Sequence, residues 1–487
     1  MNMNDNMGVA GFLKKHALLE PVSFHMPGHK GADLYRAEGY EDFLEESMNW
    51  DITEIPGADN LFQTEGVILH TMNRYKELYG SKATYLLVNG SSTGVIAAVM
   101  TAISPGDTVV MARNCHKSAF NGLGLAGGRP VYAYPEMIED FGITGEVSAA
   151  EIEKKLAEAP GAKAVIVTSP NYYGVCSDIA AIAEVTHRAG AVLIVDQAHG
   201  AHLKFFDEYA AEHAEGRKLA AENLGADIVI NSTHKTLATL TQTAIVNICS
   251  DRVDLYDFED KLQLIESSSP SYVLMASLDI NADILEKSGH RLITGWEENL
   301  AHFYEGAATI DGLKVLHHPL LDKSKINLDM SALGIDGLTL EEKLMEKGIF
   351  VELVTGNIVM CMSGIGNSRS DFTKLRAALR SIAEEAKKDL PFADQNDGGE
   401  FSHPDVATAV RRMPIMDIPT AKERVPIEKA AGRVCALSII PYPPGVPLIC
   451  PGEVMDADTL AYAAEIRRKG EKVMGIDDQG RVVVGKQ

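Results

Sequence analysis

The stretch AVLIVDQAHG, residues 191–200, is an unbroken apolar run that ends on an acidic residue, Asp196. A continuous Val/Leu/Ile run of this length is typical of a strand covered on both faces, as in a parallel sheet. A carboxylate at the end of such a strand is costly to bury unless a cation or a hydrogen-bond donor faces it. The stretch therefore predicts a buried parallel strand with a polar site at its end. The alternative is that Asp196 only caps the following loop.

Four more runs of this kind lie in the first half of the chain: TYLLVN (84–89), DTVVMARN (107–114), AKAVIVTSP (162–170) and ADIVINSTHK (226–235). Segments with apolar residues at helical spacing lie between them, including AAEIEKKLAEA (149–159) and IAAIAEVTHRAG (179–190). This alternation predicts an α/β fold, with βα units around a mainly parallel sheet. Polar residues gather directly after each strand, at the edge where open α/β sheets bind their ligands.

The rest of the chain predicts further units. Longer helical patterns follow residue 251, and shorter strand and helix patterns between residues 313 and 390 predict a smaller α+β unit. The polar stretch 391–405 predicts a boundary, after which a helix over 456–470 precedes a closing hairpin. We therefore expect an N-terminal arm (1–50), a cofactor-binding large domain (51–255), linking helices with a small α+β domain (256–390) and a C-terminal α+β domain (391–487).

Composition narrows the class of protein. The 487 residues exceed what one hydrophobic core usually supports, and 46% hydrophobic with 23% charged residues is ordinary for a globular enzyme. The net charge of −23 argues against a nucleic-acid partner and favours a small cationic ligand, although an acid excess can also serve solubility alone. The six cysteines lack metal-site spacing, which favours reduced thiols. No membrane span or leader pattern is found, so a cytoplasmic location is expected.

The loop VNGSSTG, residues 88–94, follows the first of these strands and leads into a helix. The free backbone N–H groups and the dipole of a helix start form an anion site, so a phosphate fits beside Ser91, Ser92 and Thr93. The loop matches neither the P-loop nor the dinucleotide fingerprint, which argues against a nucleotide-binding Rossmann module. Alternatively, Ser91 and Ser92 would only cap the helix.

Lys235 ends the strand segment ADIVINSTHK, and the stretch 230–244 around it contains no carboxylate. Neighbouring parallel strands bring their carboxyl ends to one edge, so Lys235 and Asp196 are expected to meet there. A lysine among small hydroxyl groups can have a lowered pKa and become nucleophilic toward an aldehyde. An aldehyde, a phosphate and a ring nitrogen kept protonated by an aspartate together describe pyridoxal phosphate. His116 could stack on the ring, and Ser232 and His234 could reach the phosphate.

At this point the sequence resembles a family. It is similar to the ornithine/lysine/arginine decarboxylases of the short bacterial type. These enzymes have the pyridoxal-phosphate fold of aspartate aminotransferase (fold type I). The similar stretches span nearly the whole chain: FHMPGHKG (24–31), DITEIPGADNL (51–61), VNGSSTG (88–94), RNCHKS (113–118), SPNYYGV (169–175), DQAHGAH (196–202), NSTHK (231–235) and PYPPGVPLICPGE (441–453).

The resemblance implies a role for each candidate residue. Lys235 would be the Schiff-base lysine, Asp196 the partner of the ring nitrogen, His116 the stacking residue, and His199 a neighbour of the imine and the substrate carboxylate. The phosphate would be held by Ser91, Ser92, Thr93, Ser232 and His234. It also implies a homodimer or larger assembly with active sites at the subunit interface. Glu453, at the end of a segment that would close over the site, is a candidate partner for the distal cation of a substrate.

The implied activity is the decarboxylation of a basic amino acid to its amine, with arginine or lysine favoured over ornithine and a link to polyamine biosynthesis. Two other readings stay open. One is another reaction on the same scaffold, such as transamination, for which Arg369 could grip a carboxylate, or β-elimination. The other is a non-catalytic relative that acts as a regulatory binder.

Two positions depart from the family pattern. Gln197 stands where many members have a glutamate after the aspartate, which removes a charge beside Asp196. Phe62 stands where many have a histidine, in the stretch DNLFQT. The second departure puts the substrate in doubt more than the type of reaction.

Overall fold

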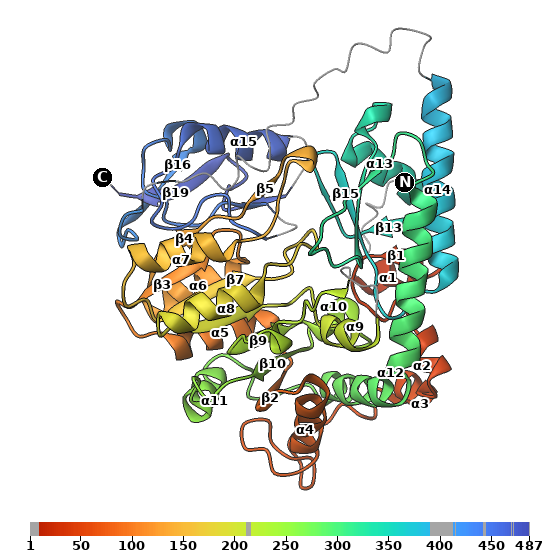
Figure 1. Cartoon of the computed structure of the whole chain (residues 1–487), viewed down its shortest axis with the longest axis horizontal. Coiled ribbons are helices and arrows are strands. Elements are labelled where there is room, and N and C mark those ends of the chain that lie inside the picture. The colour runs from red at the N-terminus through yellow and green to blue at the C-terminus, as the bar shows by residue number, and fades with distance from the viewer. Residues whose placement is uncertain are drawn as a thin grey trace.

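The structure is a computed structural model that describes residues 9–210, 216–389, 413, 415–441, 445–468, 470 and 472–486. At its centre is a seven-stranded sheet with the order β2-β10-β9-β8-β7-β3-β4. Only β10 runs antiparallel to its neighbours, whereas the strands from β9 to β4 pair in parallel. The strands are β2 Ala83–Leu87, β3 Thr108–Ala112, β4 Arg129–Ala133, β7 Ala164–Thr168, β8 Val192–Asp196, β9 Ile228–Asn231 and β10 Ala244–Ile248. The predicted α/β fold with a mainly parallel sheet is confirmed (Figure 1).

All five strands expected from apolar runs form, and β4 and β10 were not expected. In these two strands the apolar run is interrupted, by Pro130 in β4 and by Asn247 in β10. The helices expected between the strands also form, as α5 Ser91–Ala102, α7 Ala149–Glu158 and α8 Ile179–Arg188. Helix α5 packs on β8, β9 and β10, while α7 packs on β3 and β4 and α8 on β8.

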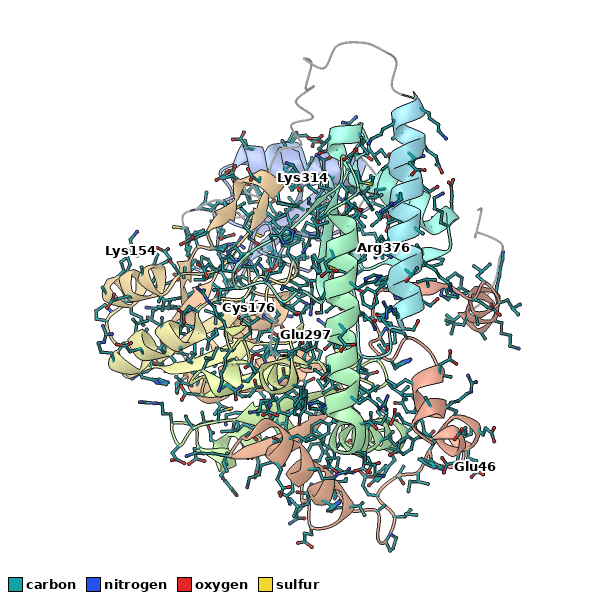
Figure 2. All side chains as sticks on the ribbon, turned by 45° about the vertical axis from the view of Figure 1, so that its right-hand side comes forward. Glu46, Lys154, Cys176, Glu297, Lys314 and Arg376 are labelled. Atoms are coloured by element: carbon teal, nitrogen blue, oxygen red, sulfur yellow. The ribbon has the colours of Figure 1, made fainter. Side chains whose placement is uncertain are left out.

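A long helix, α12 Tyr272–Ala307, connects the large sheet to a smaller one. Its apolar face extends to the end of the helix because Ile293, Trp296, Leu300 and Phe303 keep the helical spacing and are buried. It lies beside α14 Arg369–Asp389 (Figure 2). The smaller sheet has the order β11-β12-β15-β14. Its elements are β11 Lys314–Val315, β12 Lys325–Asp329, β14 Leu353–Thr355 and β15 Ile358–Met362, with α13 Gly337–Glu346 packed against it.

The N-terminal segment joins this smaller unit. Strand β1, Val22–Phe24, pairs in parallel with β13, Ile349–Val351. The apolar core is continuous between the large and small sheets, whereas a separate core runs from Met413 to Val484. The proposed domain division stays a prediction, and the whole stretch 391–405 on which it depends lies outside the described residues.

The expected closing hairpin is wrong. Strand β19, Arg481–Gly485, pairs with β16, Lys422–Pro426, and β18, Val473–Met474, pairs with β17, Ile440–Pro441. The turn residues between β18 and β19 suggest a hairpin locally. However, each of these strands pairs with a strand that precedes helix α15, Ala457–Arg468, in the chain. In the part of the chain that the structure describes, no helix combines the length and the apolar character needed to cross a bilayer.

Candidate active site

Lys235 and Asp196 come from neighbouring parallel strands. Asp196 is the last residue of β8 and pairs with Ile230 of β9, and the short helix α10, Thr233–Thr236, then carries Lys235. Each of the two charges shifts the pKa of the other group, so the side chains face the same space. The expected meeting at the carboxyl edge of the sheet therefore takes place.

The Lys235 amine suits a nucleophile. Burial lowers its pKa to about 8, although the carboxylates of Asp196 and Glu352 act in the opposite direction. Among the residues that the structure describes, none forms a hydrogen bond with this amine. Burial raises the pKa of Asp196, whose Oδ1 accepts one hydrogen bond, at 3.2 Å, from the Ala198 amide. A protonated ring nitrogen would give this carboxylate the partner that it lacks.

Orphaned polar atoms mark the same edge. Both ring nitrogens of His199 are buried without a hydrogen-bond partner, and so is Oδ1 of Asn114, which follows β3. Burial, and then the charges of Lys235 and Lys325, lower the pKa of His199 well below its usual value, so the ring is neutral. Buried polar groups without partners are rare in native proteins and point to a ligand. This set of residues fits the pyridoxal phosphate that the sequence predicts.

His116 caps helix α6, Lys117–Ala126. Its Nδ1 accepts a hydrogen bond from the Ser118 amide at 3.3 Å, so the ring is held at the start of the helix. Burial, and then the charge of Lys235, lower its pKa to about 3, which keeps the imidazole neutral near that lysine. A neutral ring fixed in this way suits the predicted stacking role.

The predicted phosphate loop begins α5. The residue before the helix is Gly90, with φ +82°, and no side chain caps the helix, which contradicts the capping alternative. The Ser232 hydroxyl donates to Ser91 Oγ at 2.7 Å, so the two predicted phosphate ligands meet, with Ser92 beside them in the first turn. Thr93 differs, because its hydroxyl donates to the Asn89 carbonyl and its amide to that of Gly90. Its assignment to the phosphate gains no support from these bonds.

His234 directly precedes Lys235 in α10. Its Nδ1 is 2.7 Å from the Thr243 carbonyl oxygen, which requires the proton on Nδ1 and leaves Nε2 for a ligand. Burial lowers its pKa to about 4. A second proton, on Nε2, would make the His234 ring a cation, and the negative charge of a phosphate would stabilise that cation.

The predicted role of Glu453 is wrong. Its carboxylate is fully buried and forms a two-pronged ion pair with Arg113, from Nε to Oε1 at 2.9 Å and from Nη2 to Oε2 at 3.0 Å. The Cys450 amide donates to the same carboxylate at 2.7 Å. With these donors the carboxylate is satisfied inside the protein and does not face a substrate cation. Arg113 lies three residues before His116, so its ion pair with Glu453 holds the C-terminal unit beside the site.

Gln197 faces away from the site. Its Nε2 donates to Glu222 Oε2 at 2.9 Å, and its Oε1 accepts from the Ala221 amide at 2.8 Å. Glu222 also accepts hydrogen bonds from the side-chain amides of Asn231 and Asn247, at 2.7 and 3.0 Å. The charge that the family pattern places at position 197 is thus carried by Glu222, within one buried network.

Gln197→Glu is expected to lower the free energy of unfolding by about 1–3 kcal/mol, because the new carboxylate would face that of Glu222 without a proton between them. Chemical denaturation monitored by circular dichroism measures this loss. Adding Glu222→Gln to the same variant should restore most of the stability, since it returns one acid and one amide to the network. Equal stability of Gln197→Glu and the wild type would contradict the account.

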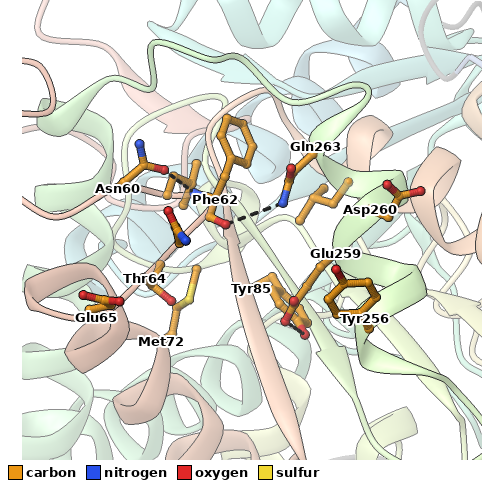
Figure 3. A pocket seen from close by; sticks show the side chains of 13 residues that line it. Asn60, Phe62, Thr64, Glu65, Met72, Tyr85, Tyr256, Glu259, Asp260 and Gln263 are labelled. Atoms are coloured by element: carbon orange, nitrogen blue, oxygen red, sulfur yellow. Dashed lines mark hydrogen bonds between the residues drawn. The ribbon is translucent and has the colours of Figure 1, made fainter.

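Phe62 lies in a separate pocket of about 780 Å³ (Figure 3). The pocket is lined by the loop 60–65 and by one face of α11, Leu255–Gln263, with Glu65, Glu259 and Asp260 among its side chains. None of the predicted cofactor residues lines it. Arg369, the candidate for a transaminase carboxylate clamp, is exposed at the start of α14.

Two residues of the smaller unit belong to the site and were missed. Glu352, between β13 and β14, influences the pKa of Lys235, and a lone acid in the apolar stretch GIFVELV was its only signal. Lys325, the first residue of β12, is fully buried and donates to the His199 carbonyl. Nothing in its local sequence separates it from a surface lysine.

Comparisons with known proteins agree with this geometry. The sequence profile described as Orn/Lys/Arg decarboxylase, major domain, matches residues 9–305, and that of the C-terminal domain matches residues 404–481. The arginine decarboxylase of Bacillus subtilis is 29% identical, over 96% of this chain and 94% of the relative. The uncharacterized protein YaaO of the same organism is 33% identical, over 95% of each.

Solved structures show the same fold. The constitutive lysine decarboxylase of Escherichia coli superposes with a TM-score of 0.72 at 22% identity, over 98% of this chain and 83% of that one. Lysine decarboxylase A of Pseudomonas aeruginosa gives a TM-score of 0.74 at 22% identity, over 98% and 82%. A serine palmitoyltransferase of Sphingomonas wittichii gives 0.55 at 15% identity, over 71% and 84%.

Proposed function

The chain belongs to the Orn/Lys/Arg decarboxylase family, and we propose that the basic amino acid it decarboxylates is arginine. It is a pyridoxal-phosphate-dependent enzyme that releases carbon dioxide from a basic amino acid and leaves the corresponding amine. The support for arginine is that four relatives of similar length are named arginine decarboxylases. Two lysine decarboxylases are longer and less similar, as is one further arginine decarboxylase. The observation that carries the decarboxylase chemistry is the buried, unbonded amine of Lys235, on which the charges of Asp196 and Glu352 act.

Residues at the carboxyl edge of the large sheet would hold the cofactor. We assign its phosphate to the first turn of α5, with Ser91, Ser92 and Ser232, and its ring nitrogen to the Asp196 carboxylate. His116 would cover one face of the ring. When bound, pyridoxal phosphate supplies an aldehyde that bonds amines and a protonated ring that accepts the electron pair left by carbon dioxide.

The reaction needs a proton donor and a dry site. The Lys235 amine has a pKa of about 8, so near neutral pH it can hold a proton and deliver it from Nζ to the carbon that has lost its carboxyl group. His199 stays neutral, so its ring can accept or donate one hydrogen bond next to the substrate carboxylate without holding that group as an ion pair. Burial of both groups excludes water, which favours loss of a charged carboxylate.

Glu352 is the carboxylate that we assign to the distal cation of the substrate. Its Oε2 accepts a hydrogen bond from the Met26 amide at 2.8 Å, which fixes the side chain, and its charge reaches Lys235. A carboxylate pairs well with the planar guanidinium of arginine, through two parallel hydrogen bonds. This assignment replaces that of Glu453.

Product analysis tests the proposal. Purified protein loaded with pyridoxal phosphate is incubated with arginine, lysine or ornithine, and the amine and the carbon dioxide are measured. We expect arginine to give the highest kcat/KM. A keto acid in place of an amine, or a clear preference for lysine, would overturn the corresponding part of the proposal.

Glu352→Gln is expected to lower kcat/KM for arginine by roughly 10- to 100-fold, mainly through KM, because a hydrogen bond to a charged group contributes about 1.5–3 kcal/mol. Steady-state kinetics on the loaded enzyme measures the change. Glu346→Gln is the matched control, since Glu346 is an exposed acid at the end of α13 in the same unit. An unchanged KM in Glu352→Gln would contradict the assignment of Glu352 to the distal cation of the substrate.

We also propose a cytoplasmic homodimer whose amine product enters polyamine synthesis. The support for a dimer is the exposure of large apolar side chains around the pocket of Phe62. Tyr256, which lines it, is 83% exposed, and Val67, at the start of the neighbouring helix α4, Val67–Tyr79, is 57% exposed. Exposed apolar groups of this size favour burial against a second copy.

A further inference from the structure

Lys325 holds the backbone of a candidate catalytic residue. Its side chain is fully buried at the start of β12, in the smaller sheet. The ammonium donates to Asp322 Oδ2 at 2.7 Å, to Ser324 Oγ at 3.1 Å and to the carbonyl oxygen of His199. All three of its N–H groups therefore have acceptors, and one acceptor belongs to the loop after β8.

His202 extends the cluster to helix α10, which follows β9. Its Nε2 lies 3.1 Å from Asp322 Oδ1 and its Nδ1 lies 3.2 Å from the Thr236 hydroxyl. Burial lowers the pKa of His202, so the ring is neutral, with its proton on Nε2 facing the carboxylate. Nδ1 then accepts from Thr236, which directly follows Lys235 in the chain.

The segment that carries Asp322 and Lys325 is also fixed to the loop after β7. The Asp322 amide donates to the Gly174 carbonyl at 2.8 Å. Gly174 has φ +90°, and a Cβ there would lie 2.7 Å from Lys325 Cβ, so only glycine permits this approach. The segments that follow three neighbouring strands of the large sheet, β7, β8 and β9, thus meet one cluster of the smaller unit.

We propose that Lys325, Asp322 and His202 are positioning residues for the decarboxylation, which hold the His199 carbonyl and the Thr236 side chain so that His199 and Lys235 keep their reactive geometry. Packing alone does not explain why Lys325 and Asp322 are charged. Apolar residues of similar volume usually stabilise a buried site as well as an ion pair does. The charge of Lys325 also helps to lower the pKa values of His199 and Lys235. The inference rests on the proposed roles of those two residues.

The first test is Lys325→Met, with Lys314→Met as the control. Lys314 is an exposed lysine of the same sheet (Figure 2). We expect kcat to fall by roughly 10- to 100-fold with little change in KM, the size of effect that a small misplacement of catalytic groups produces. Competitive acetylation of the cofactor-free protein over a range of pH, followed by peptide mapping, should show a higher pKa for Lys235. Wild-type kcat together with an unchanged labelling curve would overturn the proposal.

The second test is Thr236→Val, which removes one hydroxyl and keeps the shape, so it remains informative if Lys325→Met does not fold. A lower kcat at an unchanged melting temperature supports the proposal, and a wild-type kcat overturns the arm through His202. Failure of the proposed function is recognised separately. In that case the wild-type chain yields no amine from any basic amino acid, whereas the labelling of Lys235 still reports on the cluster.

Discussion

Lys235→Ala should reduce decarboxylation by roughly a thousandfold or more, because no other described group offers an unbonded, buried amine at the ends of β8 and β9. The variant should also lose covalent trapping: borohydride reduction of the loaded wild type should fix the cofactor on the peptide that contains Lys235, and the variant should release it. Absorbance spectroscopy and peptide mapping measure both effects.

Lys30 provides an internal control for this prediction. Burial lowers its pKa to about 7, so its basicity alone would make it a rival nucleophile. However, its ammonium donates to the carbonyl oxygens of His25 and Met362, which occupy the nitrogen. Trapping at Lys30 in the wild type, or full activity of Lys235→Ala, would refute the assignment of Lys235.

Glu453→Leu should destabilise the protein by about 3–5 kcal/mol, because it leaves the Arg113 guanidinium buried without its carboxylate. Of its hydrogen-bond acceptors among the described residues, Arg113 would retain the carbonyl oxygens of Pro447 and Leu448, at 2.7 and 2.9 Å, which carry no charge. The docked segment should loosen first. Hydrogen exchange is therefore expected to accelerate at Cys450, whose amide loses its acceptor, and at Lys117, whose amide donates to the Gly445 carbonyl at 3.1 Å.

A double variant separates the ion pair from the shape of the site. Arg113→Met with Glu453→Leu removes both charges and keeps most of the volume, so its stability should return close to that of the wild type. If the single and double variants are equally unstable, packing rather than the unpaired charge sets the cost. If Glu453→Leu is as stable as the wild type, the pair does not hold the C-terminal unit in place.

The parts of the site that follow single strands could be predicted. Asp196 ends one apolar run and Lys235 follows the next strand, β9, by four residues. The rule that parallel strands end at one edge was enough to bring them together. The same local logic found the start of α5 and the loop with His116. It failed for Glu453. The sequence around this residue resembles the segment that closes over the site in the family, but its partner, Arg113, lies 340 positions earlier in the chain.

The sequence by itself determined the βα alternation, the cofactor and the placement of Asp196 and Lys235 at one edge of the sheet, because each depends on a short pattern of neighbouring residues. Only the tertiary structure decided which charges are paired: Gln197 with Glu222, Glu453 with Arg113, and Lys325 with Asp322 beside the His199 carbonyl. A charge in a sequence can lie in water or in a core, and burial determines whether it must have a partner. The packing of distant segments determines that partner, and a local sequence pattern contains no information about this packing.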